Sequence, residues 1–310
     1  MVDESKGIAY SDGQFISVHS ASVPLLSTGF LRSDAVFDAM SVWQGNFFRL
    51  DDHMARFDSA LKSVRMTSPF SDIEMRRIAA QCVDRTGLEN AVVYILCTRG
   101  RDPDGRAFAD PRTCIQEFSA FSLPYYSAVP EECAKTGAHL YVAETRRAPS
   151  SAINQRCKNF NRMDLTRAQF EALDAGAHQP VLLSIDGYLT EGPGFNLWIV
   201  SGGDALTPGE HILEGITRRT VFDLCSEIGC EARVVDLTPD ELQNADEAFI
   251  SSTAGGIFPV SRVNDRPIGN GAPGSLTSAL RDLYWDRRKA GWHGTPVADL
   301  LAAPSVAEKT

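Results

Sequence analysis

Strand-like and helix-like patterns alternate along almost the whole chain, and this alternation constrains the fold more than any other feature. The strand-like stretches are short apolar runs such as Phe15-Ile16-Ser17-Val18, bounded by turn residues. Between them lie longer stretches in which apolar residues recur at helical spacing. Chains with this order of elements form sheets covered by helices, so we expect a fold of the α+β or α/β class.

The sequence pattern of the first 120 residues predicts a small α/β domain. Asp51 and Asp52 open an amphipathic helix, because acidic residues favour the first helical turn. Ser71 followed by Glu74 is typical of a capping box and marks the start of a second helix. The expected elements are helices over 51–66 and 71–87, strands over 91–98 and 113–122, a hairpin turn at 44–46 and a long polar loop over 100–111.

Residues 121–130 contain two prolines and two tyrosines without a clear period, which is typical of a linker. We therefore expect a small N-terminal α/β domain over 1–120, an interdomain linker over 121–130 and a larger C-terminal mixed-sheet domain over 131–310. The tail after Trp292 has few apolar anchors and is expected to fray. Expected elements of the larger domain are strands over 139–144, 181–186, 196–200 and 247–251 and helices over 162–175, 217–228 and 276–289.

Charge and cysteine usage exclude several classes of protein. The chain has 40 acidic and 30 basic residues, a formal net charge of -10 and no basic run long enough to follow a phosphate backbone, so we expect no nucleic acid partner. The seven cysteines show no CxxC spacing and indicate reduced thiols, and no spacing indicates a metal site. Because neither a signal peptide nor an apolar run of membrane-span length is present, we expect a cytoplasmic protein without a membrane partner.

Three segments join small residues to a strand end or a helix start. Residues 213–220 place Gly215 before a helix, whose first N–H groups could bind an anion. Residues 250–257 run from a strand into a hydroxyl and glycine turn that could wrap a phosphate. Taken singly, each is more typical of an ordinary cap. The third segment, 187–196, places Glu191 among glycines before an apolar strand, either as an exposed loop residue or as a buried carboxylate that needs a partner.

Lys158 gains its interest from the order of motifs along the chain. It follows an expected strand and precedes an expected helix, and by itself it would be an ordinary surface lysine. The Glu-Gly-Pro-Gly turn at Glu191, the Gly-Ile-Thr helix start and the Ser-Thr-Ala-Gly-Gly turn follow it in that order, and a helix with His53 and Arg56 precedes it. Ordinary caps and loops would rarely reproduce this joint pattern.

With these motifs in place, the chain resembles the fold-type IV aminotransferases, a two-domain fold of the D-amino-acid aminotransferase type. The resemblance runs from about Ile8 to Trp285 and is greatest to the (R)-selective amine transaminase branch. It is carried by the segments 29–34, 41–43, 47–53, 98–100, 146–149, 158–160 and 253–256.

The resemblance implies pyridoxal 5'-phosphate as cofactor and assigns two roles to single residues. Lys158 would bond to the cofactor aldehyde and then move a proton as general base and acid. Glu191 would hold the pyridine nitrogen protonated, which makes the ring a better electron sink.

The resemblance also implies a set of residues around the phosphate and the ring. Arg56 would bind the phosphate together with the backbone N–H groups of Ile216 and Thr217 and with Thr253. Leu213 resembles the apolar residue that packs on the ring face.

The motif matches are weakest on the substrate side. Arg32 stands where the (R)-amine branch usually has His, Phe37 where it has Tyr, and the run after Phe160 reads Asn-Arg-Met-Asp in place of Gln-Trp-Gly-Asp. Arg32 and Arg106 are the candidates for binding the carboxylate of a keto acid, or else they are solvated or ion-paired. The remaining substrate-side positions are Phe37, Tyr94, Tyr125 and Ala254.

The activity that the resemblance implies is a ping-pong transfer of an amino group from an amine or amino acid to an α-keto acid, with an (R)-amine as donor. Branched-chain or D-amino-acid transamination, an aminodeoxychorismate-type lyase, and a binding domain that lost its cofactor are the alternatives. The family also implies a homodimer in which each pocket is completed by the other subunit.

Overall fold

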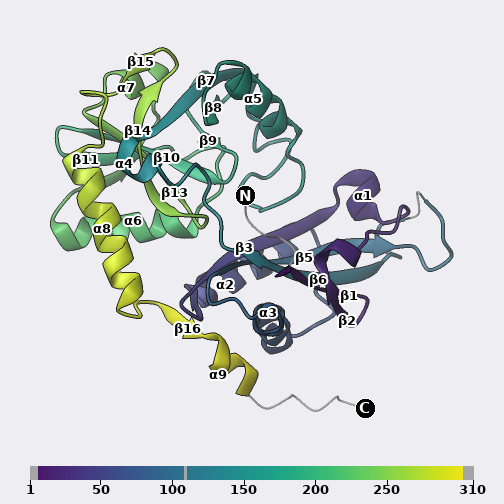
Figure 1. Cartoon of the computed structure of the whole chain (residues 1–310). Coiled ribbons are helices and arrows are strands. Elements are labelled where there is room, and N and C mark those ends of the chain that lie inside the picture. Colours follow the sequence, from purple (N-terminus) through teal and green to yellow (C-terminus); the bar gives the residue numbers. More distant parts are fainter. Residues whose placement is uncertain (1–5, 108–109, 303–310) are drawn as a thin grey trace. The chain divides into compact units, whose positions relative to one another are not determined.

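The computed structural model describes residues 6–107 and 110–302 (Figure 1). They fall into two compact units. The first unit takes in the described residues of 1–126 and 291–310 together with the short segment 157–161, and the second takes in 127–156 and 162–290. The segment that carries Lys158 therefore belongs to the first unit, although the chain on both sides of it belongs to the second.

The first unit is built on an antiparallel sheet with the strand order β16-β4-β3-β5-β6-β1-β2. Its strands are β1 (Ile8–Ser11), β2 (Gln14–Ser17), β3 (Ala35–Trp43), β4 (Asn46–Phe48), β5 (Ala91–Arg101), β6 (Ile115–Pro124) and β16 (Gly294–Pro296). Its helices are η2 (Val18–Ser20), α1 (Thr28–Arg32), α2 (Leu50–Ser63), α3 (Asp72–Thr86) and α9 (Val297–Ala302). Residues 121–124, at the start of the expected linker, form the end of β6.

Local sequence signals define the ends of these elements. The Ser71 hydroxyl accepts the Glu74 N–H at 3.3 Å, and the Glu74 carboxylate accepts the Ser71 N–H at 2.8 Å, so the predicted capping box of α3 is confirmed. Between β3 and β4, Gln44 and Gly45 both have positive φ, at 49° and 71°, which gives the tight hairpin turn that the sequence predicts.

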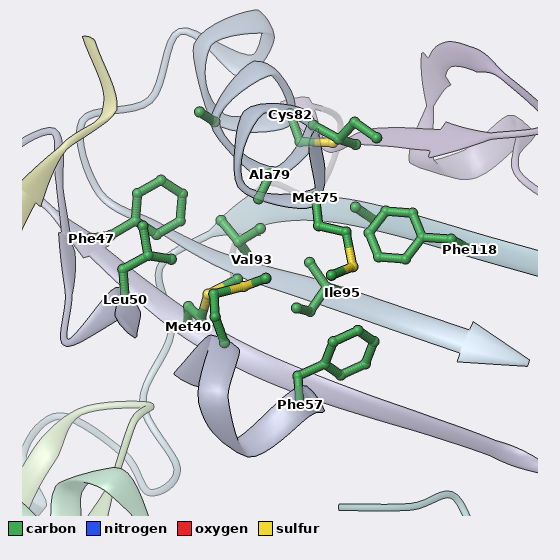
Figure 2. Packing of buried hydrophobic residues seen from close by; sticks show 14 of the residues in the cluster. Met40, Phe47, Leu50, Phe57, Met75, Ala79, Cys82, Val93, Ile95 and Phe118 are labelled. Carbon is green, nitrogen blue, oxygen red and sulfur yellow. The ribbon is translucent and has the colours of Figure 1, made fainter. Parts of the chain in front are cut away.

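The core of the first unit lies between its sheet and the helices α2 and α3. Figure 2 shows Phe57 of α2 and Met75 and Ala79 of α3 facing Val93 and Ile95 of β5. Each of these side chains is buried. Because the packed face of β5 is fixed in this way, the alternate residues of the strand point to its other face.

The carboxy-terminal segment differs from the expectation of a frayed tail. Thr295 of β16 pairs with Phe47, and Arg49 donates a 3.1 Å hydrogen bond to His293. Helix α9 packs against α3. A pairing between residues so far apart in sequence has no local signature, so the sequence pattern missed it. Residues 303–310 lie outside the described part.

The second unit is built on a mixed sheet, as expected, with the order β12-β11-β10-β13-β14-β7-β8. Strand β7 runs parallel to both β8 and β14, whereas β10, β13 and β14 are antiparallel neighbours. Its strands are β7 (Ala138–Arg146), β8 (Gln179–Leu183), β9 (Glu191–Gly192), β10 (Phe195–Ser201), β11 (Asp204–Thr207), β12 (Ala232–Val234), β13 (Glu247–Ser252), β14 (Gly256–Val263) and β15 (Arg266–Pro267).

Helices pack on this sheet through its apolar side chains. The helices are α4 (Cys133–Thr136), α5 (Met163–Asp174), α6 (Ile216–Ile228), α7 (Pro239–Gln243) and α8 (Ser275–Lys289). Trp198 of β10 is fully buried, stacks on Phe249 at 5.5 Å and meets Phe222 of α6 edge-on at 5.1 Å. Helix α8, yellow in Figure 1, lies against α6, β13 and β14. Within residues 6–107 and 110–302, none of the helices has the length and apolar character that a membrane crossing requires.

A buried ionic network joins β3 to α2 in the first unit. Asp38 is fully buried, and its carboxylate accepts hydrogen bonds from Arg56 Nε and Nη2 at 2.8 Å and from His53 Nδ1 at 2.7 Å. Burial by itself would raise the pKa of Asp38, but the Arg56 charge and the bonds from His53 and Arg56 hold that pKa well below its usual range. Burial lowers the pKa of His53, against the opposing effect of Asp38. The network therefore holds an ionised aspartate beside a neutral histidine.

We expect Asp38→Asn to lower the free energy of unfolding by about 3–5 kcal/mol near neutral pH, because the change removes the buried carboxylate that is paired with Arg56. The pKa of Asp38 is lower in the folded protein, so the stabilisation is present above its unfolded pKa of about 4 and is lost as pH falls further. Urea unfolding measured from about pH 7 to about pH 3 gives the free energy of unfolding of both proteins. The difference between wild type and variant in this free energy should shrink as the pH falls.

The matched control is Asp58→Asn, which removes an exposed ion pair with Lys62 from the same helix and should change stability little. A difference that stays constant with pH, or the same small effect for both variants, would contradict this account of Asp38.

Candidate functional site

The backbone of Lys158 is held against strand β3. The Phe37 N–H donates to the Lys158 carbonyl at 3.0 Å, and Asn159 forms an isolated antiparallel bridge with Val36. The side chain is half-buried, and its ammonium lies 4.7 Å from the centroid of the Phe37 ring. Lys158 is therefore a fixed residue of a strand edge and differs from an ordinary surface lysine.

A row of aromatic rings extends from Lys158 across the first unit. Phe37 packs on Phe160 at 4.5 Å and stacks on Tyr94 at 6.1 Å, and Tyr94 stacks on Phe121 at 4.6 Å with 9° between the ring planes. We call Phe37, Tyr94, Phe121 and Phe160 the aromatic row. The hydroxyl of Tyr94 also hydrogen-bonds the hydroxyl of Tyr126. The surface beside the lysine is thus mostly apolar, with a polar edge at the two tyrosines.

Arg56 and Lys158 both act electrostatically on His53. The charges of both residues lower the pKa of His53, after the larger effect of burial. The Arg56 side chain is 12% exposed, and its Nε and Nη2 are oriented by Asp38. The first unit therefore places an amine and an oriented guanidinium around one buried histidine.

In the second unit, Glu191 is a buried carboxylate with fixed partners. It is 6% exposed and occupies the short strand β9. Arg147 Nη2 donates to Oε1 at 3.0 Å, and the Leu213 N–H donates to Oε2 at 2.9 Å. Arg147 is itself buried and also binds Asp164 at 2.6 Å and Gln155 at 2.5 Å. The alternative of an exposed loop glutamate is wrong.

No sequence signal assigns a role to Arg147 by itself. It belongs to the Arg-Arg-Ala-Pro segment that contributes to the resemblance, but its partner lies 44 residues along the chain. The sequence offered only a general signal: a buried carboxylate needs a cation, and this arginine follows closely after a predicted strand.

The start of helix α6 packs on Asn196, in the hairpin that β9 and β10 form. Gly215 is the N-cap residue, and a Cβ placed there would lie 2.1 Å from Asn196 Oδ1, so a larger residue would displace the Asn196 amide. The first N–H groups of a helix have no acceptor within it, and those of Ile216 and Thr217 are two of them. The anion site that the sequence predicts at this helix start therefore stays a prediction.

The turn between β13 and β14 carries Thr253 and Ala254, which are both half-buried. The Ser252 hydroxyl donates to the Gly194 carbonyl at 2.8 Å and accepts the Ala254 N–H at 3.1 Å. Gly255 has φ +110°, and a Cβ there would meet the Phe258 ring at 2.3 Å. The turn is therefore tied to the Glu191 hairpin through Ser252.

The arginines predicted on the substrate side lie in more open surroundings. Arg32 is exposed in the last turn of α1. Arg106 is bound through two nitrogens to the Asp102 carboxylate at 2.9 Å and also contacts Asp104 at 3.2 Å. Tyr125 is half-buried, with its ring 5.5 Å from that of Trp43. The loop of Arg106 thus supplies its own counter-ions.

The donors present fit the cofactor that the resemblance implies. Pyridoxal phosphate presents an aldehyde, a basic ring nitrogen and a phosphate, which call for an amine, a carboxylate and an anion site. The first unit supplies the Lys158 amine and the Arg56 guanidinium. The second supplies the Glu191 carboxylate and the start of α6, where a Cβ would fill the space at Gly215. Each unit therefore holds one part of the required set.

Comparisons with known proteins agree with this chemistry. The family model of the class IV amino-transferases matches residues 35–263. A Methanocaldococcus jannaschii protein provisionally named branched-chain-amino-acid aminotransferase is 31% identical over 90% of this chain and 96% of its own length. The D-alanine aminotransferase of Bacillus licheniformis is 29% identical over 87% of this chain and 93% of its own.

A solved structure gives the same answer for the fold. A branched-chain amino acid aminotransferase crystallised with pyridoxamine 5'-phosphate superposes with a TM-score of 0.86 at 29% identity, covering 94% of this chain and 98% of that one. The chain thus belongs to the class IV aminotransferases and is a pyridoxal-phosphate-dependent aminotransferase.

Proposed function

We propose that the enzyme is an (R)-selective amine transaminase, which transfers an amino group from an amine or amino acid to an α-keto acid in a ping-pong cycle. The observation that carries this proposal is the aromatic row that begins at the Lys158 ammonium. A donor carbon held at the lysine would direct one substituent toward these rings, which favour an apolar group. The segments that resemble the (R)-selective amine transaminases support the same donor class.

Lys158 is the proposed proton carrier of the reaction. Its backbone is fixed on β3, so the Nζ approaches the donor carbon from a defined side. The bound cofactor supplies an electron sink that stabilises negative charge at that carbon. Lys158 would take the proton from the donor carbon as a base and return a proton to the cofactor side as an acid.

Glu191 and Arg147 are the proposed anchor of the ring nitrogen. The carboxylate would accept a hydrogen bond from the protonated nitrogen, which favours the charged ring in the transition state. Arg147 and the Leu213 N–H hold the two carboxylate oxygens and fix their direction. Leu213 would also pack on the ring face.

The proposed phosphate site combines charge with backbone donors. Arg56, oriented by Asp38, would offer a guanidinium, while Ile216 and Thr217 would offer N–H groups at the start of α6. The Thr253 hydroxyl would complete the set. Ala254, next to it in the turn, would border the substrate, as Phe37, Tyr94 and Tyr125 would.

Arg106 and Arg32 are proposed to bind the acceptor carboxylate. Arg106 is paired with Asp102, so binding a keto acid would exchange one carboxylate partner for another. An exchange of this kind would let the same loop turn away when an apolar amine is bound. Arg32 is the more exposed candidate at the end of α1.

We also propose that the enzyme is a homodimer in which the partner subunit completes each pocket. The apolar side chains around α1 support it, because Leu25 is 73% exposed and Phe30 is 62% exposed. Exposed apolar groups gathered along one short segment are typical of an interaction surface.

A second candidate function is transamination of branched-chain amino acids. It is favoured by the Methanocaldococcus jannaschii relative and by the solved branched-chain aminotransferase structure. A branched aliphatic side chain could pack on the aromatic row as well as an aryl group could.

We expect Lys158→Ala to lower the rate of amino transfer by at least about 10³-fold, because no other group would carry the proton. Stopped-flow absorbance with an amine donor alone should show one turnover per site in the wild type, and continuous turnover should require a keto acid. Lys62→Ala, at an exposed ion pair of α2, is the control and should behave as wild type. Continuous turnover without acceptor would favour a lyase, and full activity of Lys158→Ala would refute the role of this lysine.

We expect (R)-1-phenylethylamine to exceed its mirror image as donor by about tenfold or more, with pyruvate or 2-oxoglutarate as acceptor. The aromatic row gives the aryl group one preferred side, and the resemblance to the (R)-selective amine transaminases gives the expected hand. Initial rates for both enantiomers, with L-leucine for comparison, provide the measurement. Rapid use of L-leucine with neither enantiomer of the arylamine accepted would favour the branched-chain alternative.

A further inference from the structure

Asn196 is a buried polar residue to which the mechanism above gives no role. It lies at the start of β10, is 5% exposed, and is paired directly with Glu191 across the β9–β10 hairpin. The two residues that lie opposite each other in such a pair have their side chains on the same face of the sheet. Asn196 and Glu191 therefore point to the same region of the second unit.

Both side chains bind Leu213, one on each side of that residue. The Leu213 N–H donates to Glu191 Oε2 at 2.9 Å, and Asn196 Nδ2 donates to the Leu213 carbonyl at 2.8 Å. The peptide groups before and after Leu213 are thus held by two residues of one hairpin. A segment fixed at both groups has little freedom to shift along or turn about its own axis.

The other end of the Asn196 amide touches the start of α6. A Cβ on Gly215 would lie 2.1 Å from Asn196 Oδ1, so the glycine backbone packs directly on the amide oxygen. Gly215 is the N-cap residue, and Ile216 and Thr217 follow as the first residues of the helix. One side chain therefore contacts both the residue bonded to Glu191 and the first turn of the proposed phosphate site.

We propose that Asn196 is a positioning residue that sets the place of the phosphate-binding helix start relative to the Glu191 carboxylate. This inference rests on the proposed function, which assigns the ring nitrogen to Glu191 and the phosphate to the start of α6. A rigid ligand bound at both ends gains full affinity only when the two anchors keep the separation that it requires. Loss of the amide frees Leu213 and Gly215 to move. The contact of the α6 start with the phosphate then weakens, while Lys158 and Glu191 keep their positions.

A comparison of two ligands separates positioning from ordinary structural support. The full-length protein, freed of cofactor, is titrated with pyridoxal phosphate and with pyridoxal, which lacks the phosphate. Wild type should prefer pyridoxal phosphate strongly. Asn196→Ala should reduce that preference by about tenfold, the equivalent of about 1.4 kcal/mol, with most of the loss in pyridoxal phosphate affinity.

Gln179→Ala is the matched control. Gln179 lies on strand β8 of the same unit, and its side-chain amide donates a hydrogen bond of the same 2.8 Å length to the Ala128 carbonyl. Its loss should lower stability without changing the ratio of the two affinities. Asn196→Ser, which stays neutral and is too short to keep the bond to Leu213, serves as the second variant should Asn196→Ala not fold, and it should also reduce the preference.

The outcomes are distinct. An unchanged affinity ratio in folded Asn196 variants would overturn the positioning role. A wild-type protein that does not bind pyridoxal phosphate, or that does not prefer it to pyridoxal, would instead overturn the proposed function on which this role depends.

Discussion

The structure depends on the pairing of buried charges. A carboxylate taken out of water costs more than a fold can usually offset unless cations and hydrogen bonds surround it. In the first unit Asp38 is held by Arg56 and His53, and in the second Glu191 is held by Arg147 and the Leu213 N–H. Each network fixes the direction of a charged group to which the proposed function assigns a contact with the cofactor.

The two networks have opposite chemical consequences. Asp38 orients a cation, Arg56, whereas Arg147 orients an anion, Glu191. Neighbouring elements add an amine and backbone donors to these charges. The amine is that of Lys158 on the edge of β3, and the donors are the N–H groups at the start of α6. The aromatic row adds an apolar surface beside the Lys158 ammonium.

Much of the fold could be predicted from the sequence, because local signals control helix ends and hairpin turns. The capping box at Ser71 and the turn at Gly45 are both present, and helix α6 begins within one residue of its expected start. The pairing of β16 with β4 could not be predicted, since strand partners far apart in sequence leave no local mark.

The candidate site was found from the order of its motifs, and its partners were not. Asp38 lies inside the apolar run of β3, where an acidic residue is costly, and this was the one available sign that it is paired. His53 and Arg56 follow on one face of α2, but only the folded chain shows that they reach that strand. Asn196 and Arg147 are similar cases, because a buried amide or guanidinium can be identified only from its contacts.

The account can be tested most directly by locating the covalent bond to the cofactor. The protein is loaded with pyridoxal phosphate, reduced with borohydride, digested with trypsin and mapped by mass spectrometry. The account predicts the reduced cofactor on Lys158, within the peptide between Arg156 and Arg162. Labelling of a different lysine, or no labelling of a protein that has bound the cofactor, would contradict it.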